Sequence, residues 1–90
     1  MRNKNLEKYR ELDKNFFSGR IHWTYTWNNG VCDECIEWDD DLNLYSYYSY
    51  SEKKEYKFKD VYEAFNNIKI NGKTITYLLI HTDFNIDSIN

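Results

Sequence analysis

The chain has 90 residues, the length of one small domain, so residues 1–90 are expected to form a single folding unit. Its 12 basic and 15 acidic residues give a net charge of −3, which argues against a general nucleic-acid binder, because such proteins normally present a basic face. No apolar run reaches the roughly 18 residues that cross a bilayer, and the polar start lacks the apolar core of a signal peptide, so a cytoplasmic location is expected.

The first segment has the spacing of an amphipathic helix. Over residues 3–14, Leu6, Tyr9 and Leu12 recur at the spacing of one helix face, while lysines and glutamates occupy the other face. Gly19 follows as a C-terminal cap. The sequence therefore predicts a terminal helix over 3–14.

Residues 20–27 give the clearest strand pattern, because large apolar side chains alternate with small polar ones. The side chains expected to face the core are Ile21, Trp23, Tyr25 and Trp27. The following Asn28, Asn29 and Gly30 tolerate positive φ and predict a hairpin turn.

Cys32 and Cys35 are the only two cysteines, and they form a C-x-x-C spacing directly after that turn. Residues three apart in a regular strand point to opposite faces, so the cysteines can share a metal only if residues 31–35 form a turn-like knuckle. We predict the knuckle, with the returning strand at 35–38. One unbroken strand over 31–38 would contradict this prediction.

The middle of the chain has the pattern of two more strands and a helix. Three consecutive aspartates at 39–41 predict a solvated turn, residues 42–51 a tyrosine-rich strand, and residues 55–58 a short strand. Asp60 can cap a helix, with Glu63 three residues later completing a capping-box pair. The buried face of this helix would consist of Val61, Ala64, Phe65 and Ile68.

The last third of the chain is less distinct. Asn71-Gly72 predicts a turn, and residues 73–81 fit either a strand or one face of a helix, of which we predict the strand. The polar tail from Asp83 is expected to form a short edge strand or to fray. These elements predict an α+β fold, an antiparallel sheet of four to five strands with an N-terminal helix and one internal helix.

Four side chains are candidate ligands of a structural Zn²⁺. Zinc is held tetrahedrally by thiolates and imidazoles, and the chain's cysteines and histidines are Cys32, Cys35, His22 and His81. His22 lies on the strand that leads into the same hairpin, whereas His81 is near only if its segment neighbours that hairpin. Oxygen donors that could replace a histidine are Asp33, Glu34 and Asp83. The alternative is two reduced cysteines and two ordinary surface histidines.

Enzyme chemistry has little support in the sequence. A C-x-x-C pair can cycle a disulfide at a helix N-terminus, but here it follows a turn, and the intervening Asp33 and Glu34 disfavour a thiolate. The chain contains no G-x-S-x-G, no H-E-x-x-H and no glycine-rich phosphate loop. We therefore expect a protein that is not an enzyme.

Six acids and no base occur from residue 33 to residue 41, whereas the first twenty residues are basic. The acidic segment is either a solvated hairpin end or a negative patch that docks on a basic surface. The tyrosines of 42–51 either pack the sheet or present a binding platform. The candidate partner-binding residues are Asp33, Glu34, Glu37, Asp39, Asp40, Asp41 and Tyr47.

The whole chain resembles small phage-encoded anti-CRISPR proteins that act on type II effector nucleases. The resemblance is one of profile: a short, acidic chain, rich in tyrosine and asparagine, without catalytic motifs, whose Cys32/Cys35 pair would suit the zinc that a few of those proteins contain. It implies a non-enzymatic inhibitor in the bacterial host cell that occupies a basic surface of the nuclease and blocks DNA loading, without binding nucleic acid itself. The basic first segment departs from a pure DNA mimic and leaves the binding face open. The alternative is a small zinc-stabilised module that regulates nucleic-acid processes.

Overall fold

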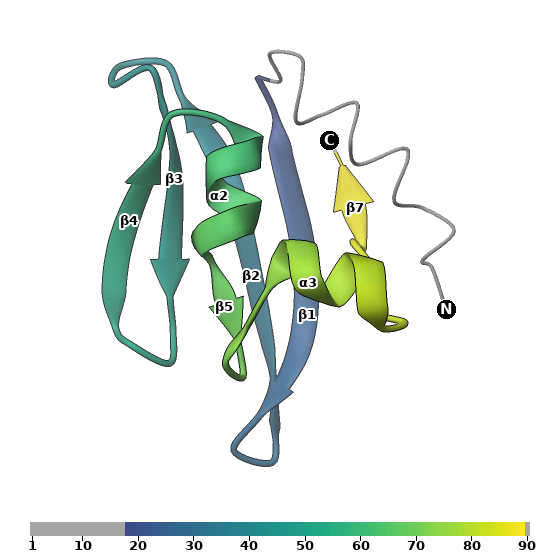
Figure 1. Ribbon diagram of the computed structural model, residues 1–90. Helices are drawn as coiled ribbons and strands as arrows, with labels where there is room; N and C mark the ends of the chain where they lie inside the picture. Colours follow the sequence, from purple (N-terminus) through teal and green to yellow (C-terminus); the bar gives the residue numbers. More distant parts are fainter. Residues whose placement is uncertain (1–17, 90) are drawn as a thin grey trace.

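The computed structural model describes residues 18–89, and the helix expected over 3–14 lies outside them. Five strands form one antiparallel sheet in the order β4-β3-β2-β1-β7, and β5 pairs with β6 in a small separate hairpin (Figure 1). The α+β class and the antiparallel sheet are confirmed, and both described helices lie in the second half of the chain. The elements are β1 (Arg20–Trp27), β2 (Gly30–Asp39), β3 (Leu44–Ser49), β4 (Lys54–Phe58), α2 (Val61–Asn67), β5 (Lys69–Ile70), β6 (Lys73–Thr74), α3 (Ile75–His81) and β7 (Ser88–Ile89).

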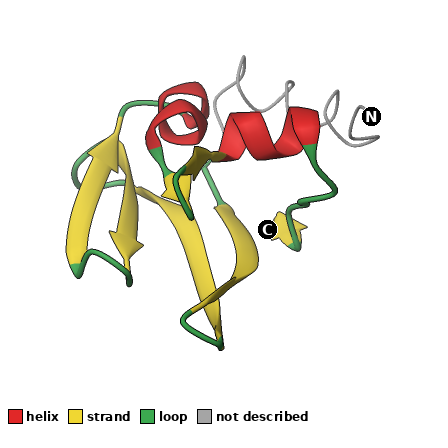
Figure 2. Ribbon diagram, turned by 60° about the horizontal axis from the view of Figure 1, so that its bottom comes forward, coloured by secondary structure: helices red, strands yellow, loops and turns green. Residues whose placement is uncertain are grey.

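The sheet and the two helices form two layers. Figure 2 shows α2 and α3 on the same side of the sheet, which we call the inner face. Neither helix covers the opposite, outer face. The core lies between the layers, because an antiparallel sheet of alternating side chains buries one face against the helices. Its largest fully buried side chains are Trp23, Phe65, Ile21, Ile36, Ile75, Leu79 and Val61.

β1 has the predicted bounds, and its alternation is confirmed. Ile21 and Trp23 are fully buried, whereas Trp27 is 36% exposed. The side chains on the inner face of β1 are therefore less buried toward the tip of the hairpin. Asn28 and Asn29 form the turn with φ values of 51° and 63°, and positive φ at both central residues is the signature of a type I′ turn.

β2 is one unbroken strand from Gly30 to Asp39, so the knuckle predicted over residues 31–35 is wrong. Every residue from Gly30 to Glu37 has an antiparallel partner in β1. A knuckle would break this ladder and leave backbone N–H and C=O groups without partners. Continuous pairing therefore prevails over the local C-x-x-C pattern.

α2 begins as predicted. The Glu63 backbone N–H donates to Asp60 Oδ1 at 2.7 Å, and the Glu63 carboxylate accepts from the Lys59 backbone N–H at 3.1 Å, so both ends of the capping pair are used. The predicted buried face is confirmed, since all four of its side chains are at most 2% exposed: Val61, Ala64, Phe65 and Ile68.

The strand predicted over 73–81 is wrong from Ile75 onward, where α3 begins. Thr74 caps this helix, because its hydroxyl oxygen accepts from the Tyr77 backbone N–H at 3.1 Å. Ile75 and Leu79 lie one helical turn apart and are both buried in the core. Their i, i+4 spacing and the cap outweigh the strand propensity of the threonine and isoleucine residues.

The turn at residues 71–72 is confirmed, with φ values of 52° for Asn71 and 87° for Gly72. Of the two alternatives for the tail, the structure shows the edge strand. Ile89 of β7 pairs with Ile21 of β1, and this pairing places the C-terminal strand beside the first one (Figure 1).

Candidate functional site

The register of β1 and β2 sorts the candidate residues onto two faces of the sheet. His22 pairs with Cys35, and both side chains project from the outer face. Tyr25 pairs with Cys32 on the inner face, which Glu34 shares because it lies two residues further along β2. The two cysteines therefore project from opposite faces.

The four predicted zinc ligands are not brought together. Cys32 is on the inner face, Cys35 and His22 are on the outer face, and His81 lies at the end of α3 with its ring centroid 4.5 Å from that of Tyr77. Within residues 18–89, no group of three or more histidine, cysteine, aspartate or glutamate side chains is arranged to hold a metal ion. The unbroken strand places the two thiols of the C-x-x-C pair on opposite faces of the sheet.

Cys35 is also in an unfavourable setting for thiolate chemistry. Burial raises the pKa of its thiol, and the nearby Arg20 guanidinium lowers it only in part. A protonated thiol is a weak nucleophile and a poor metal ligand. Both cysteines are free thiols.

We expect the purified chain to hold no stoichiometric zinc and to unfold at the same temperature with and without a chelator. The reason is that β2 would have to break its pairing with β1 before Cys32 and Cys35 could share a metal. Elemental analysis and thermal melts with EDTA check this, beside the variants Cys32→Ser and Cys35→Ser. One zinc per chain that both variants lose, with a lower melting temperature, would contradict the register.

The inner face contains a buried carboxylate that binds three donors. Glu34 is 3% exposed. Its Oε1 accepts from the Tyr47 hydroxyl at 2.9 Å, and its Oε2 accepts from the Tyr25 hydroxyl at 3.0 Å and the Tyr50 backbone N–H at 3.1 Å. These donors replace the water that the carboxylate loses on burial. Glu34 thereby joins β1, β2 and the end of β3, beyond the Ile36–Tyr47 pair where the ladder between β2 and β3 stops.

We call Glu34 and its three donors the carboxylate clamp. Its two tyrosines, Tyr25 and Tyr47, are held in the protonated state. Burial is the largest cause that raises the pKa of Tyr25 and of Tyr47, and the Glu34 charge that accepts both hydroxyl protons raises each further. Deprotonating either phenol would place two negative charges in contact in a partly buried environment. In the clamp, two neutral phenol groups donate hydrogen bonds to one charged carboxylate. The clamp therefore depends on the phenol protons.

Two of the predicted partner-binding residues are buried. Glu34 and Tyr47, 3% and 4% exposed, belong to the carboxylate clamp and contribute little surface to the outer face. Glu34 was included because of its acidic neighbours along the chain. Glu34 and Ile36 are two residues apart, so they point to the same face of a strand. A strand over residues 31–38 therefore predicts that Glu34 is buried with Ile36.

The outer face contains a shallow depression with a volume of about 950 Å³, which we call the acidic hollow. Tyr48 and Tyr50 line it with exposed rings, 45% and 53% exposed, that pack edge to face with centroids 5.2 Å apart. The sequence did not single out these two tyrosines. Arg20 and His22 also line the hollow. Its surface carboxylates are Asp33, Glu37, Asp39, Asp40, Asp41 and Glu55.

Two bases near the acidic hollow, Lys57 and His22, have carboxylate partners. Lys57 Nζ lies 2.6 Å from the Glu55 carboxylate and 2.7 Å from Ser46 Oγ. His22 Nε2 lies 3.1 Å from the carboxylate of Asp33, which is 70% exposed. Acids outnumber bases in the hollow, so its field attracts a positively charged surface.

The turn at residues 39–41 is ordered by its own aspartates. Asp39 Oδ1 accepts from the Asp41 backbone N–H at 2.9 Å, and the Trp38 indole donates to Asp40 Oδ1 at 2.7 Å. This predicted turn is confirmed. Its carboxylates are held in place before any partner arrives, which lowers the entropy cost of binding.

Within the described part of the chain, no helix is long and apolar enough to cross a membrane. Comparison with protein-family models, curated proteins and solved structures finds no match to this chain.

Proposed function

We propose that this chain is a non-enzymatic inhibitor that binds another protein by laying the acidic hollow on a basic, nucleic-acid-handling surface. The observation that carries the proposal is the set of six surface carboxylates on a sheet face that neither described helix covers. On β2, Asp33, Glu37 and Asp39 are at alternate strand positions, so they form one row along the face. Such a row competes with a phosphate backbone for lysine and arginine side chains.

The exposed aromatic pair supports binding to protein rather than simple repulsion of nucleic acid. Tyr48 and Tyr50 offer apolar area with a polar tip beside the carboxylates. Tyrosine at such a site buries area at low entropy cost and is enriched among the residues that dominate interface energy. The acidic rim would steer the encounter, and the tyrosines would slow dissociation.

The partner that we propose to test first is a type II CRISPR effector nuclease in the bacterial cytoplasm, the class suggested by the overall profile of the sequence. Occupying the channel that loads target DNA would inhibit the nuclease without any chemistry by this chain. The mechanism requires that the chain and the DNA exclude each other, since both bind the same cationic side chains.

An order-of-addition experiment tests this proposal. The nuclease with its guide RNA is mixed with labelled target DNA in a mobility-shift assay, and the chain is added either before or after the DNA. We expect loss of the shifted complex when the chain is added first, and much less effect when the DNA is already loaded. An unchanged DNA shift at saturating chain, or steeply salt-dependent binding of the chain itself to bulk DNA, would contradict the proposal.

A further inference from the structure

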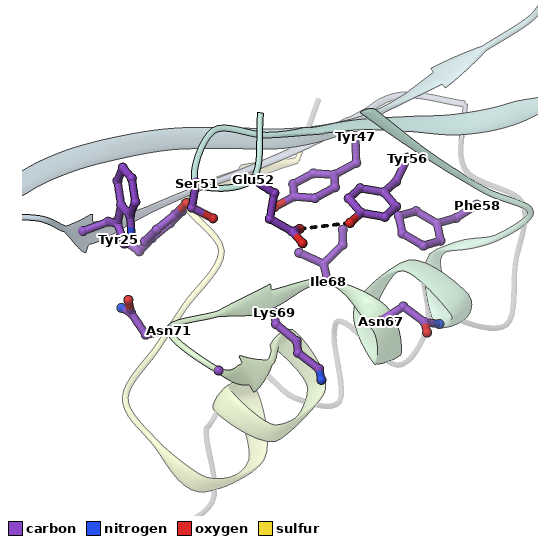
Figure 3. A pocket seen from close by; sticks show the side chains of 12 residues that line it. Tyr25, Tyr47, Ser51, Glu52, Tyr56, Phe58, Asn67, Ile68, Lys69 and Asn71 are labelled. Carbon is purple, nitrogen blue, oxygen red and sulfur yellow. Dashed lines mark hydrogen bonds between the residues drawn. The ribbon is translucent and has the colours of Figure 1, made fainter. Parts of the chain in front are cut away.

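A second concave site lies on the helix side of the sheet, away from the acidic hollow. It is a pocket of about 500 Å³ between the sheet and the β5–β6 hairpin (Figure 3). This volume is within the range of small-molecule sites in proteins. Five aromatic side chains line it: Tyr25, Trp27, Tyr47, Tyr56 and Phe58.

Three of the aromatic rings are ordered by packing on one another in near-parallel pairs. Tyr47 and Tyr56 have ring centroids 6.1 Å apart with planes at 27°, and Tyr56 and Phe58 have centroids 6.2 Å apart with planes at 12°. Figure 3 shows these three rings side by side, with Tyr25 across the pocket from them. Ring faces carry the negative part of the aromatic quadrupole.

Two carboxylates add negative charge to this site. Glu52 lines the pocket and accepts from the Tyr56 hydroxyl at 3.1 Å, a bond that raises the pKa of Tyr56. Glu34 lies behind the rings and accepts the hydroxyl protons of Tyr25 and Tyr47. One cation of the chain already uses such a ring face, because Lys54 Nζ lies 5.2 Å from the centroid of Tyr56.

We propose that this pocket binds an alkylammonium group, either on a free small cation or at the end of a lysine side chain. Aromatic faces together with a carboxylate form the recognised chemistry for quaternary ammonium ions, because they attract the charge without demanding a hydrogen-bond donor. Tyr47 lines both sites, but the other residues that line the pocket differ from those of the acidic hollow. We therefore expect the pocket to hold a ligand whether or not a protein partner occupies the outer face.

An anionic ligand fits the pocket less well. Among residues 18–89, Lys69 is the one cationic side chain that lines it, and in Figure 3 its ammonium points away from the Tyr47 and Tyr56 rings. A phosphate would meet the Glu52 carboxylate instead. The amides of Asn67 and Asn71 complete the polar rim and are compatible with a cation through their carbonyl oxygens.

Choline and its neutral isostere 3,3-dimethylbutan-1-ol test the role of the charge. The readout is the indole N–H resonance of Trp27, assigned with Trp27→Phe, because this residue lines the pocket. We expect a saturable shift with choline and a much weaker one with the alcohol. Equal responses to both compounds, or no saturable shift with choline, would overturn the proposal.

Three variants, two of them a matched pair, locate the binding energy. Glu52→Gln removes the pocket carboxylate and should weaken choline binding about fivefold. Glu55→Gln makes the same change on the outer face and should leave binding unchanged. Lys69→Gln should strengthen binding by removing a like charge. Equal weakening by Glu52→Gln and Glu55→Gln would show non-specific charge attraction and would overturn the site.

The last comparison distinguishes the two sources of the cation. Blocked lysine and blocked trimethyl-lysine are titrated beside choline in the same assay. Tighter binding of either amino acid supports a side chain from a protein, whereas tighter binding of choline supports a free cation. Failure of all three overturns the proposal and leaves the proposed inhibitor function intact.

Discussion

Replacing Glu34 with alanine lowers the free energy of unfolding by about 3 to 5 kcal/mol. The change leaves two tyrosine hydroxyls and the Tyr50 backbone N–H without their acceptor and opens a cavity where the strand ladder ends. In a domain of this size, the melting temperature should fall by more than about 10 °C. Chemical unfolding monitored by tryptophan fluorescence measures the effect.

Glu37 provides the matched control for that experiment. It lies on the same strand but is exposed on the outer face, so Glu37→Ala should change stability by no more than about 0.5 kcal/mol. Glu34→Gln keeps the size of the side chain and one acceptor oxygen, and should fall between the two. Equal stability of the Glu34→Ala and Glu37→Ala variants would show that the carboxylate clamp does not hold the strands together.

Stability should also fall steeply once the pH exceeds 10.0, the ordinary pKa of tyrosine. Tyr25 and Tyr47 have pKa values raised in the folded state, chiefly by burial and then by Glu34. A raised pKa contributes stability that is complete below the unfolded value and is lost as the pH rises toward the folded value. Each such tyrosine contributes a slope of about 1.4 kcal/mol per pH unit in that window.

The slope, rather than the stability itself, identifies the residues responsible. Tyr47→Phe removes one of the two protons and should make the alkaline loss shallower, even though the variant starts from a lower stability. Tyr62→Phe is the control, since Tyr62 is 61% exposed on α2. The free energy of unfolding in urea is measured at several pH values above 10.0, the ordinary pKa of tyrosine. An identical slope in the two variants would remove Tyr47 from this explanation.

Local patterns in the sequence were sufficient for much of the fold. Alternation in residues 20–27 and the capping pair at Asp60 and Glu63 each depend on neighbours in the chain, and both were confirmed. Residues 75–81 were ambiguous, because threonine and isoleucine favour a strand while the spacing of Ile75 and Leu79 favours a helix. Only the packing of that face against the core decides between them.

The candidate sites were harder to predict because they depend on register. The C-x-x-C spacing suggested a local metal knuckle, but continuous pairing with β1 sends the thiols of Cys32 and Cys35 to opposite faces. The same parity buries Glu34. Its contact with Tyr47 joins residues 13 apart in the sequence, and no local pattern predicts that the ladder stops where the carboxylate can enter.

The acidic hollow was predicted in part. The aspartates of the 39–41 turn and the outward acids of β2 do gather on one face, as the charge run suggested. Tyr48 and Tyr50 join them through the antiparallel pairing of β2 with β3, which the composition of each segment alone could not show. The sequence thus predicted the charge of this surface and left open whether the tyrosines of 42–51 pack the sheet or face outward, but it did not select Tyr48 and Tyr50.

The most direct test of the proposed inhibitor compares two charge reversals in the DNA-loading assay. Glu37→Lys places a positive charge inside the acidic hollow, whereas Asp83→Lys makes the same change of net charge after α3. We predict that Glu37→Lys raises the half-inhibitory concentration at least about tenfold, because like charges then face each other, and that Asp83→Lys stays close to the unmodified chain. Equal inhibition by both variants would contradict the assignment of the outer face as the binding surface.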